Sequence, residues 1–285
     1  MADRRRVLEK HLYRTLKGTC ETWSLLRPGD RVMVALSGGK DSYTLLHLLD
    51  RLVPRLEFPV ELVAVHLDQS QPGYDGRPLV EWLEQRGGAF EILREDTYSE
   101  VVERTAPGGT YCAVCSRLRR GILYTAAERL GCTAIALGHH RDDALETFLM
   151  NLFFAGKLQA MPARYVTDDG RFRVIRPLLD CDEERIAELA SLVGFPILPC
   201  NLCGSQEGLQ RERMAELLAT LERSHPHVRS VMRNALGNVR PTHLLDPDVL
   251  EAWEARPPHV RPDVEAEAKP PRFEAQPVRR LPLVD

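Results

Sequence analysis

The sequence lacks any long hydrophobic run. No stretch of its 285 residues approaches the ~20 apolar residues of a membrane-spanning helix, and the opening MADRRRVLEKHL contains no apolar signal core. We therefore expect a cytoplasmic protein with no membrane segment. No internal repeat is present.

Net charge is also small. The chain carries −3, and residues 246–285, with nine acids and six bases, account for all of it. The remaining residues contain 32 acids and 32 bases. Any nucleic acid must therefore be bound by local basic patches, because the overall charge does not favour a polyanion.

Cysteine is scarce outside two CxxC pairs. The pairs hold four of the seven cysteines, and no cysteine follows Cys203. In a cytoplasmic protein this pattern favours metal or redox chemistry over a disulfide framework. The isolated Cys20, Cys132 and Cys181 are expected to be small buried hydrophobic residues.

A strand, a glycine loop and a helix follow one another between Arg31 and Leu52. Arg31 to Leu36 is an apolar, β-branched run of strand length, and Tyr43 to Leu52 repeats apolar residues with a helical period. The loop between them reads SGGKDS. Its two glycines let backbone N–H groups converge on an anion where the helix dipole is positive. This predicts a phosphate-binding loop, and a plain glycine turn is the alternative.

The predicted phosphate loop is not a GxxxxGK[ST] P-loop. Asp41 stands where that motif needs Ser or Thr, and Val34 stands where it needs its first glycine. The residues expected to bind the nucleotide phosphates are Ser37, Gly38, Gly39, Lys40, Asp41 and Ser42.

Strands alternate with helices along the first two thirds of the chain. Further strands are expected at Glu61–Leu67, Phe90–Leu93 and Thr133–Leu137. The alternation predicts an α/β fold, a parallel sheet with helices on both faces, together with an N-terminal helix and a C-terminal helical extension.

We expect four regions along the chain. Residues 1–28 would form an N-terminal helical region, 29–203 the α/β domain with an inserted hairpin, and 204–245 a C-terminal helical region. Nine of the twenty prolines lie beyond Arg240, so residues 246–285 are expected to form a poorly ordered tail.

The string GHHRDD follows the strand expected at Thr133–Leu137. Its two histidines and two carboxylates, Asp142 and Asp143, would lie at a carboxyl strand end, where they suit a magnesium ion or a proton transfer. The alternative is that the string only caps the helix expected at Ala144–Phe154.

Basic residues cluster in three places. The helix expected at Arg4–Leu26 has apolar residues at every fourth position and basic residues on another face. A hairpin at Ala163–Pro177 is predicted to carry three arginines on one face, and the helices expected at Ser205–Glu222 and Ser224–Arg233 expose others. Each face is either a phosphate contact or a solvated surface. The hairpin arginines are Arg171, Arg173 and Arg176.

The two CxxC pairs have metal-ligand spacing. Cys112 and Cys115 would lie in a loop before a helix N-capped by Ser116, and Cys200 and Cys203 lie just before another expected helix. Four thiolates suit a structural zinc site, whereas three suit a [4Fe-4S] cluster with one iron left open.

Several motifs resemble known families. SGGKDS resembles the signature of the PP-loop ATP pyrophosphatases, and CAVCSRLRRGILY, ALGHHRDD and PCNLCGSQ resemble the tRNA 2-thiocytidine synthetases, from roughly Arg31 to His243. The resemblance implies ATP, Mg²⁺ and a [4Fe-4S] cluster held by three cysteines. It also implies thiolation of cytidine 32 in tRNA, sulfur from a cysteine desulfurase, and a homodimer.

The resemblance also assigns residues. Cys112, Cys115 and Cys203 would hold the cluster, and the helix expected after Cys203 supports that choice weakly, so that Cys200 stays an alternative. The loop would hold the leaving pyrophosphate. Asp41, Asp142 and Asp143 would support the metal and catalysis, and Arg119 is a further phosphate candidate.

Two other functions are also compatible with the sequence. A 2-thiouridine synthetase would share loop and cluster, but those relatives carry extra cysteine pairs at both ends. A zinc-stabilised RNA-binding protein would explain the thiols without ATP chemistry. Lysidine-type ligation would leave the CxxC pairs without a role.

Overall fold

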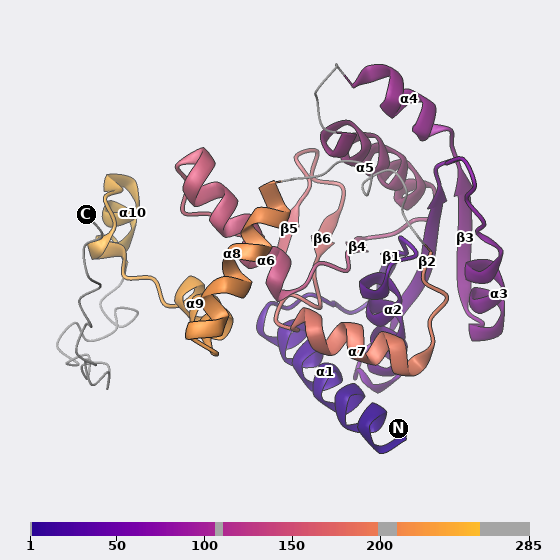
Figure 1. Ribbon diagram of the computed structural model, residues 1–285, viewed down its shortest axis with the longest axis horizontal. Helices are drawn as coiled ribbons and strands as arrows, with labels where there is room; N and C mark the ends of the chain where they lie inside the picture. Colours follow the sequence, from indigo (N-terminus) through magenta and orange to yellow (C-terminus); the bar gives the residue numbers. More distant parts are fainter. Residues whose placement is uncertain (1, 106–110, 199–209, 257–285) are drawn as a thin grey trace, which may run out of the picture. The chain divides into compact units, whose positions relative to one another are not determined.

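A six-stranded sheet forms the centre of the protein. The computed structural model describes residues 2–105, 111–198 and 210–256, and the chain divides into two units, 1–237 and 238–285. In the first unit the strand order is β3-β2-β1-β4-β6-β5, and only the β5–β6 pair is antiparallel (Figure 1). The strands are β1 (Asp30–Ala35), β2 (Val60–Asp68), β3 (Ala89–Arg94), β4 (Ala134–Ala136), β5 (Arg164–Val166) and β6 (Arg173–Ile175).

Helices cover both faces of this sheet. Helices α1, α2, α3 and α7 share one apolar core, and α5 packs on the opposite face (Figure 1). This arrangement confirms the predicted α/β fold class. The first-unit helices are α1 (Ala2–Thr22), α2 (Lys40–Leu52), α3 (Arg77–Arg86), α4 (Thr97–Arg104), α5 (Tyr111–Arg129), α6 (Arg141–Met150), α7 (Glu183–Val193), α8 (Gln210–Ser224) and α9 (Val228–Gly237), with short turns η1 (Val53–Arg55) and η2 (Asn151–Ala155).

Strand β1 is buried on both faces. Val32 and Val34 point into the core shared with α2, whereas Met33 between them points into the core shared with α5. Successive side chains of a strand point to opposite faces, so an unbroken apolar run is what a central parallel strand requires. This strand delivers the SGGKDS loop to the edge where the other parallel strands also end.

The burial of the N-terminal helix and of the isolated cysteines matches the predictions, although the helix spans Ala2–Thr22 and not Arg4–Leu26. The apolar residues of α1 that step by four are all buried, and Cys132 and Cys181 are also buried. Burial raises the pKa of the Cys20 thiol to about 12, which keeps it protonated and unreactive. The α1 residues are Leu8, Leu12, Leu16 and Cys20.

Helix α5 begins earlier than the sequence predicted. Ser116 is not its N-cap, because the helix begins at Tyr111 and includes the first CxxC pair in its opening turns. Val114 and Cys115 pack with Val101 of α4 in a small apolar cluster. Packing against α4 outweighs the local capping preference of a serine.

The prediction that three hairpin arginines share one face was wrong. Arg173 pairs with the buried Asp30 at the start of β1, whereas Arg176 donates to Pro162 O and to His139. Positions 173 and 176 are an odd number apart, so they point to opposite faces of the strand. Arg171 lies in the turn and pairs with Asp169.

The second unit contains two described elements, η4 (Pro241–His243) and α10 (Pro247–Glu254). The expectation of a poorly ordered tail from Asp246 onward fails for α10, because the Asp246 side chain accepts the Val249 N–H and Pro247 begins the helix. Residues 257–285 lie outside the described part. No helix within the described ranges is long and apolar enough to cross a bilayer.

Candidate functional site

The SGGKDS loop joins β1 to α2. Gly39 is the N-cap of α2, and no side chain among the described residues caps this helix end. The N–H groups of its first turn are therefore available to an external acceptor, at the end where the helix dipole is positive. This geometry is that of an anion-binding site.

Hydroxyl hydrogen bonds hold the loop in shape. Ser42 Oγ donates to Gly39 O at 2.9 Å and accepts the Ser37 backbone N–H at 3.1 Å. Gly38 has φ +85°, which strongly favours glycine, and its carbonyl accepts the Leu198 N–H at 2.9 Å. Gly38 therefore serves the loop conformation as the sequence predicted, whereas Gly39, with φ −86°, adopts a conformation open to other residues.

The GHHRDD string meets this loop at the same sheet edge. Strands β1 and β4 are parallel neighbours, so the segments that follow them lie side by side. A Cβ on Gly138 would lie 3.1 Å from Asp41 C and 3.1 Å from Ser42 N. Only glycine allows this close approach.

Lys40 and Asp41 form an ion-pair cluster with Glu183 of α7. Lys40 Nζ lies 2.9 Å from Glu183 Oε1 and 3.2 Å from Asp41 Oδ1. Burial opposes the charge on Lys40, but its two carboxylate partners outweigh burial and raise its pKa. The lysine is therefore charged.

Asp41 has one carboxylate oxygen without a hydrogen bond in the described part of the chain, whereas its Oδ2 atom accepts from Lys40 Nζ at 3.3 Å. Its Oδ1 atom is buried and makes no hydrogen bond with any described residue, although Lys40 is within ion-pair distance. Burial raises the pKa of Asp41, and the nearby negative charge of Asp143 adds to this effect. An added cation would relieve both effects.

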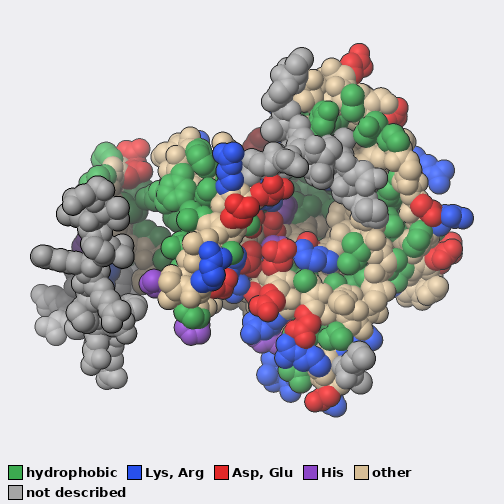
Figure 2. Space-filling view, in the orientation of Figure 1, with side chains coloured by type: hydrophobic (Ala, Val, Ile, Leu, Met, Phe, Trp, Pro, Cys, Tyr) green, Lys and Arg blue, Asp and Glu red, His purple; other side chains and the backbone are tan. Residues whose placement is uncertain are grey.

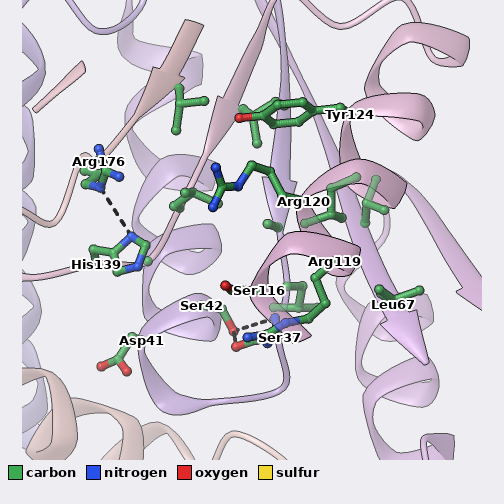
Figure 3. A pocket seen from close by; sticks show the side chains of 18 of the residues that line it. Ser37, Asp41, Ser42, Leu67, Ser116, Arg119, Arg120, Tyr124, His139 and Arg176 are labelled. Carbon is green, nitrogen blue, oxygen red and sulfur yellow. Dashed lines mark hydrogen bonds between the residues drawn. The ribbon is translucent and has the colours of Figure 1, made fainter. Parts of the chain in front are cut away.

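His139 and His140 have different roles. His140 is the N-cap of α6 in a reciprocal capping box with Asp143, which confirms the capping interpretation for this residue. His139 lines the pocket, and burial lowers its pKa to about 4. Arg176 Nε donates to its Nδ1 atom at 3.3 Å, so the proton of the neutral ring is assigned to Nε2 (Figure 3).

Asp142 is fully engaged by its neighbours. Its Oδ2 atom accepts the Glu183 N–H at 2.9 Å, and its Oδ1 atom accepts from Arg229 of α9 at 2.7 Å. Burial alone would raise its pKa, but the neighbouring arginines and the Glu183 N–H lower it. Asp143 is held by Arg211 of α8 at 3.1 Å. Acidic side chains gather where α6, α7 and α8 meet (Figure 2).

A pocket of about 860 Å³ lies beside the loop. Ser37, Asp41 and Ser42 line one side, and Arg119 and Arg120 extend into it from α5 (Figure 3). Helix α5 thus supplies two cations to the same space as the anion-binding helix end. Further lining residues are Gln69, Ser116, Tyr124, His139, Asp143, Gln159, Pro162, Tyr165 and Arg176.

Cys115 lies next to this pocket. Its side chain is 2% exposed, and its Sγ atom lies 3.3 Å from Gln69 Oε1. Gln69 and Ser116 both line the pocket, and Cys115 lies directly behind them without lining it. The side chain of Cys112 and all of Cys200 and Cys203 lie outside the described residues.

Sequence reasoning found part of this site. It selected the loop, the GHHRDD string and Arg119, all of which contribute residues to the pocket. The predicted site residues of the loop and the string that do not line the pocket are Gly38, Gly39, Lys40 and Asp142. It missed Arg176 as a pocket residue and Glu183 as the partner of Lys40. For Arg176 a signal existed, because it directly follows β6 at the carboxyl edge.

Comparisons with known proteins agree with this site. The PP-loop domain family matches residues 8–196. A tRNA-cytidine(32) 2-sulfurtransferase from Cytophaga hutchinsonii is 50% identical over 252 residues, covering 87% of this chain and 88% of the relative. Its counterpart from Sorangium cellulosum is 49% identical over 239 residues, or 84% of each chain.

A solved structure shares the fold. The U34-tRNA thiolase NcsA from Methanococcus maripaludis, determined with its [4Fe-4S] cluster, matches with a TM-score of 0.64 and 23% identity, over 83% of this chain and 81% of that one. At this identity the likeness concerns the fold. The extended similarity to the sulfurtransferases decides the family, and this chain therefore belongs to the tRNA-cytidine(32) 2-sulfurtransferase family of PP-loop proteins.

Proposed function

We propose that this chain uses ATP to convert cytidine 32 of tRNA to 2-thiocytidine. The observation that carries the proposal is that the SGGKDS loop lines the same pocket as Ser116 and Gln69, the chain neighbour and the hydrogen-bond partner of Cys115. Relatives of about half identity over most of the chain bear the name of this activity. The pocket supplies what the reaction needs, namely a phosphate site and a thiol beside it.

The first step is activation of the C2 oxygen. This oxygen is a poor leaving group, so it attacks the α-phosphorus of ATP and pyrophosphate leaves. The uncapped start of α2 binds the pyrophosphate, and Arg119 stabilises its charge from α5. Lys40 reaches the phosphates by exchanging its bond with Glu183, because an anion of higher charge competes with a single carboxylate.

A magnesium ion fits beside this step. The buried Oδ1 atom of Asp41 has no hydrogen bond among the described residues, and carboxylate oxygens are ligands that Mg²⁺ prefers. Asp41 and Asp143 would hold the ion, which would neutralise charge on the leaving pyrophosphate. No described group of three His, Cys, Asp or Glu side chains is arranged to bind a metal by itself, so nucleotide oxygens would complete the coordination.

The second step replaces the activated oxygen with sulfur. A sulfur nucleophile adds to C2, and AMP leaves with the former C2 oxygen. Cys112, Cys115 and Cys203 would hold a [4Fe-4S] cluster, which when bound supplies a site for that sulfur. The buried, apolar surroundings of Cys115 suit such a group. A cysteine desulfurase as the sulfur source and a homodimeric state belong to the same proposal.

His139 is placed to orient the base. Its ring is neutral at pH 7, because burial lowers its pKa to about 4. The hydrogen bond from Arg176 fixes the proton on Nε2, so this atom donates to an acceptor on the substrate. A neutral donor orients the cytosine without placing a second positive charge against Arg176.

Nucleoside analysis tests the function. Anaerobically reconstituted protein is incubated with ATP, Mg²⁺, sulfide and unmodified tRNA, and the digested nucleosides are separated by mass. We expect 2-thiocytidine only when ATP is present. Formation of 2-thiouridine instead would transfer the function to the uridine-modifying relatives, and a colourless protein that binds one zinc and forms neither would support a structural role.

A further inference from the structure

The segment after α6 projects an apolar surface. Every residue from Leu152 to Gln159 is exposed, including two adjacent phenylalanines that are each 55% exposed. Leu152 is 38% and Leu158 is 68% exposed. Single exposed apolar residues are common, but four large ones within seven residues are characteristic of an interaction site. We name residues 152–158 the aromatic turn.

The aromatic turn is held in place at both ends. Asn151 Nδ2 donates to Gln159 O at 2.7 Å, and the Lys157 N–H donates to Asn151 O at 3.0 Å. Gly156 has φ +62°, which lets the chain reverse after η2. These bonds present Phe153 and Phe154 from a defined backbone, with ring centroids 6.5 Å apart and planes at 80°.

The aromatic turn leads directly into the pocket. Gln159, the residue after it, and Pro162 both line the pocket that contains the phosphate loop. Hydrophobic side chains gather on the surface beside α6 and α8 (Figure 2). A substrate whose reacting base enters the pocket along this side brings its neighbouring groups close to the turn.

The local charge favours a polyanion. The 21 residues from Thr147 to Thr167 contain no Asp or Glu, although the chain as a whole has slightly more acids than bases. Lys157 and Arg164 in this stretch are exposed. A segment that combines exposed aromatic rings with cations and contains no acids matches the stacked bases and phosphates of single-stranded RNA.

We propose that Phe153 and Phe154 stack on unpaired RNA bases next to the target base, while Lys157 and Arg164 contact the adjoining phosphates. This inference rests on the proposed function, since it names the contact through which the tRNA loop reaches the pocket. Stacking does not depend on base identity, so the aromatic turn contributes affinity and positioning, and the pocket supplies the choice of base.

Substitutions that separate stacking from apolar contact test the proposal. Phe153→Ala and Phe154→Ala are compared with the leucine and tyrosine variants in the full-length protein. The probes are unmodified tRNA and its isolated anticodon stem-loop, measured by fluorescence anisotropy. We expect about tenfold weaker binding for each alanine variant, partial recovery with leucine and nearly full recovery with tyrosine. Trp23→Ala, which removes an exposed aromatic ring outside the pocket lining, should leave binding unchanged.

Sedimentation of the same variants tests whether a second copy of this chain, and not RNA, binds the aromatic turn. If the alanine variants change the oligomeric state and leave RNA affinity unchanged, the aromatic turn is an interface between copies of this chain and the proposal is wrong. Equal RNA binding by alanine, leucine and tyrosine variants would also overturn it. The proposed function is tested separately, because wild-type protein that forms 2-thiocytidine retains that function whatever the variants bind.

Discussion

Two helix starts meet at the pocket, and they hold their carboxylates in opposite ways. At the start of α2, the Oδ1 atom of Asp41 is buried without a hydrogen bond among the described residues, and its pKa is raised by burial. At the start of α6, Asp142 accepts a backbone N–H and an arginine, and its pKa is lowered overall. One carboxylate is available to a ligand, whereas the other is already engaged.

This difference indicates that Asp41 serves the reaction and that Asp142 stabilises the fold. Asp41 lines the pocket and Asp142 does not. Asp142 instead connects three elements, because it lies on α6, accepts from the first N–H of α7 and pairs with Arg229 of α9. Sequence alone grouped the two residues as equivalent catalytic carboxylates, but the structure assigns them different interactions.

Asp41→Asn should have the largest effect. Removing the anionic ligand is expected to lower the rate of ATP-dependent thiolation about a hundred- to a thousandfold, because charge developing on the pyrophosphate loses its stabilisation. The protein should remain folded, since asparagine keeps the shape of the side chain and the Oδ1 atom of Asp41 makes no hydrogen bond with a described residue. Single-turnover kinetics with circular dichroism measures both properties. A fully active Asp41→Asn protein would remove Asp41 from the metal site.

Arg229→Ala should mainly lower the stability of the protein. The side chain of Asp142 is only 4% exposed, and loss of its partner leaves a buried carboxylate with fewer donors. We expect about 3 kcal/mol lower free energy of unfolding, measured by urea denaturation. Arg229→Lys should restore part of the loss. Arg223→Ala, on the exposed side of α8, is the matched control and should change little. Equal stability of both alanine variants would contradict the supporting role of Asp142.

Gly138→Ala should disturb the start of α2, because Gly138 lies against the backbone of Asp41 and Ser42. The added Cβ would lie 3.1 Å from the backbone of Asp41 and Ser42, so the phosphate loop must shift. We expect about a tenfold rise in KM for ATP, with a stability loss on the order of 1 kcal/mol. Gly121→Ala, in α5, has open space at its Cβ position and serves as the control. An unchanged KM would show that the loop tolerates the shift.

Glu146→Gln should have the smallest effect on activity, and its effect on stability should depend on pH. Burial, followed by the negative charge of Asp143, raises the pKa of Glu146 to about 7, so its ionisation in the folded protein costs stability as pH rises from about 4.5 to 7. The glutamine variant should therefore be more stable than wild type at pH 8, by up to about 3 kcal/mol, and similar at pH 4.5. Thermal unfolding at the two pH values checks this sign. A variant that is less stable at pH 8 would show that the pairing with Arg211 dominates.

The sequence was most informative where local pattern and function coincide. The SGGKDS loop needs a strand, glycines and a helix start in immediate succession, and each has a local signal. The pairing of Asp142 with Arg229 joins residues 87 positions apart, and Cys115 meets Gln69 across 46 positions. Such pairs depend on tertiary packing, which no local period encodes. The same limit explains the early start of α5, since contact with α4 determines it.

The central claim is that nucleotide activation and sulfur transfer use one pocket but different residues. Anaerobic single-turnover reactions of Cys115→Ala with ATP and tRNA, monitored for pyrophosphate and 2-thiocytidine together, test it most directly. We predict tRNA-dependent pyrophosphate release without 2-thiocytidine. Formation of 2-thiocytidine at the wild-type rate would contradict the role of Cys115, and loss of tRNA-dependent pyrophosphate release would contradict the separation of the two steps.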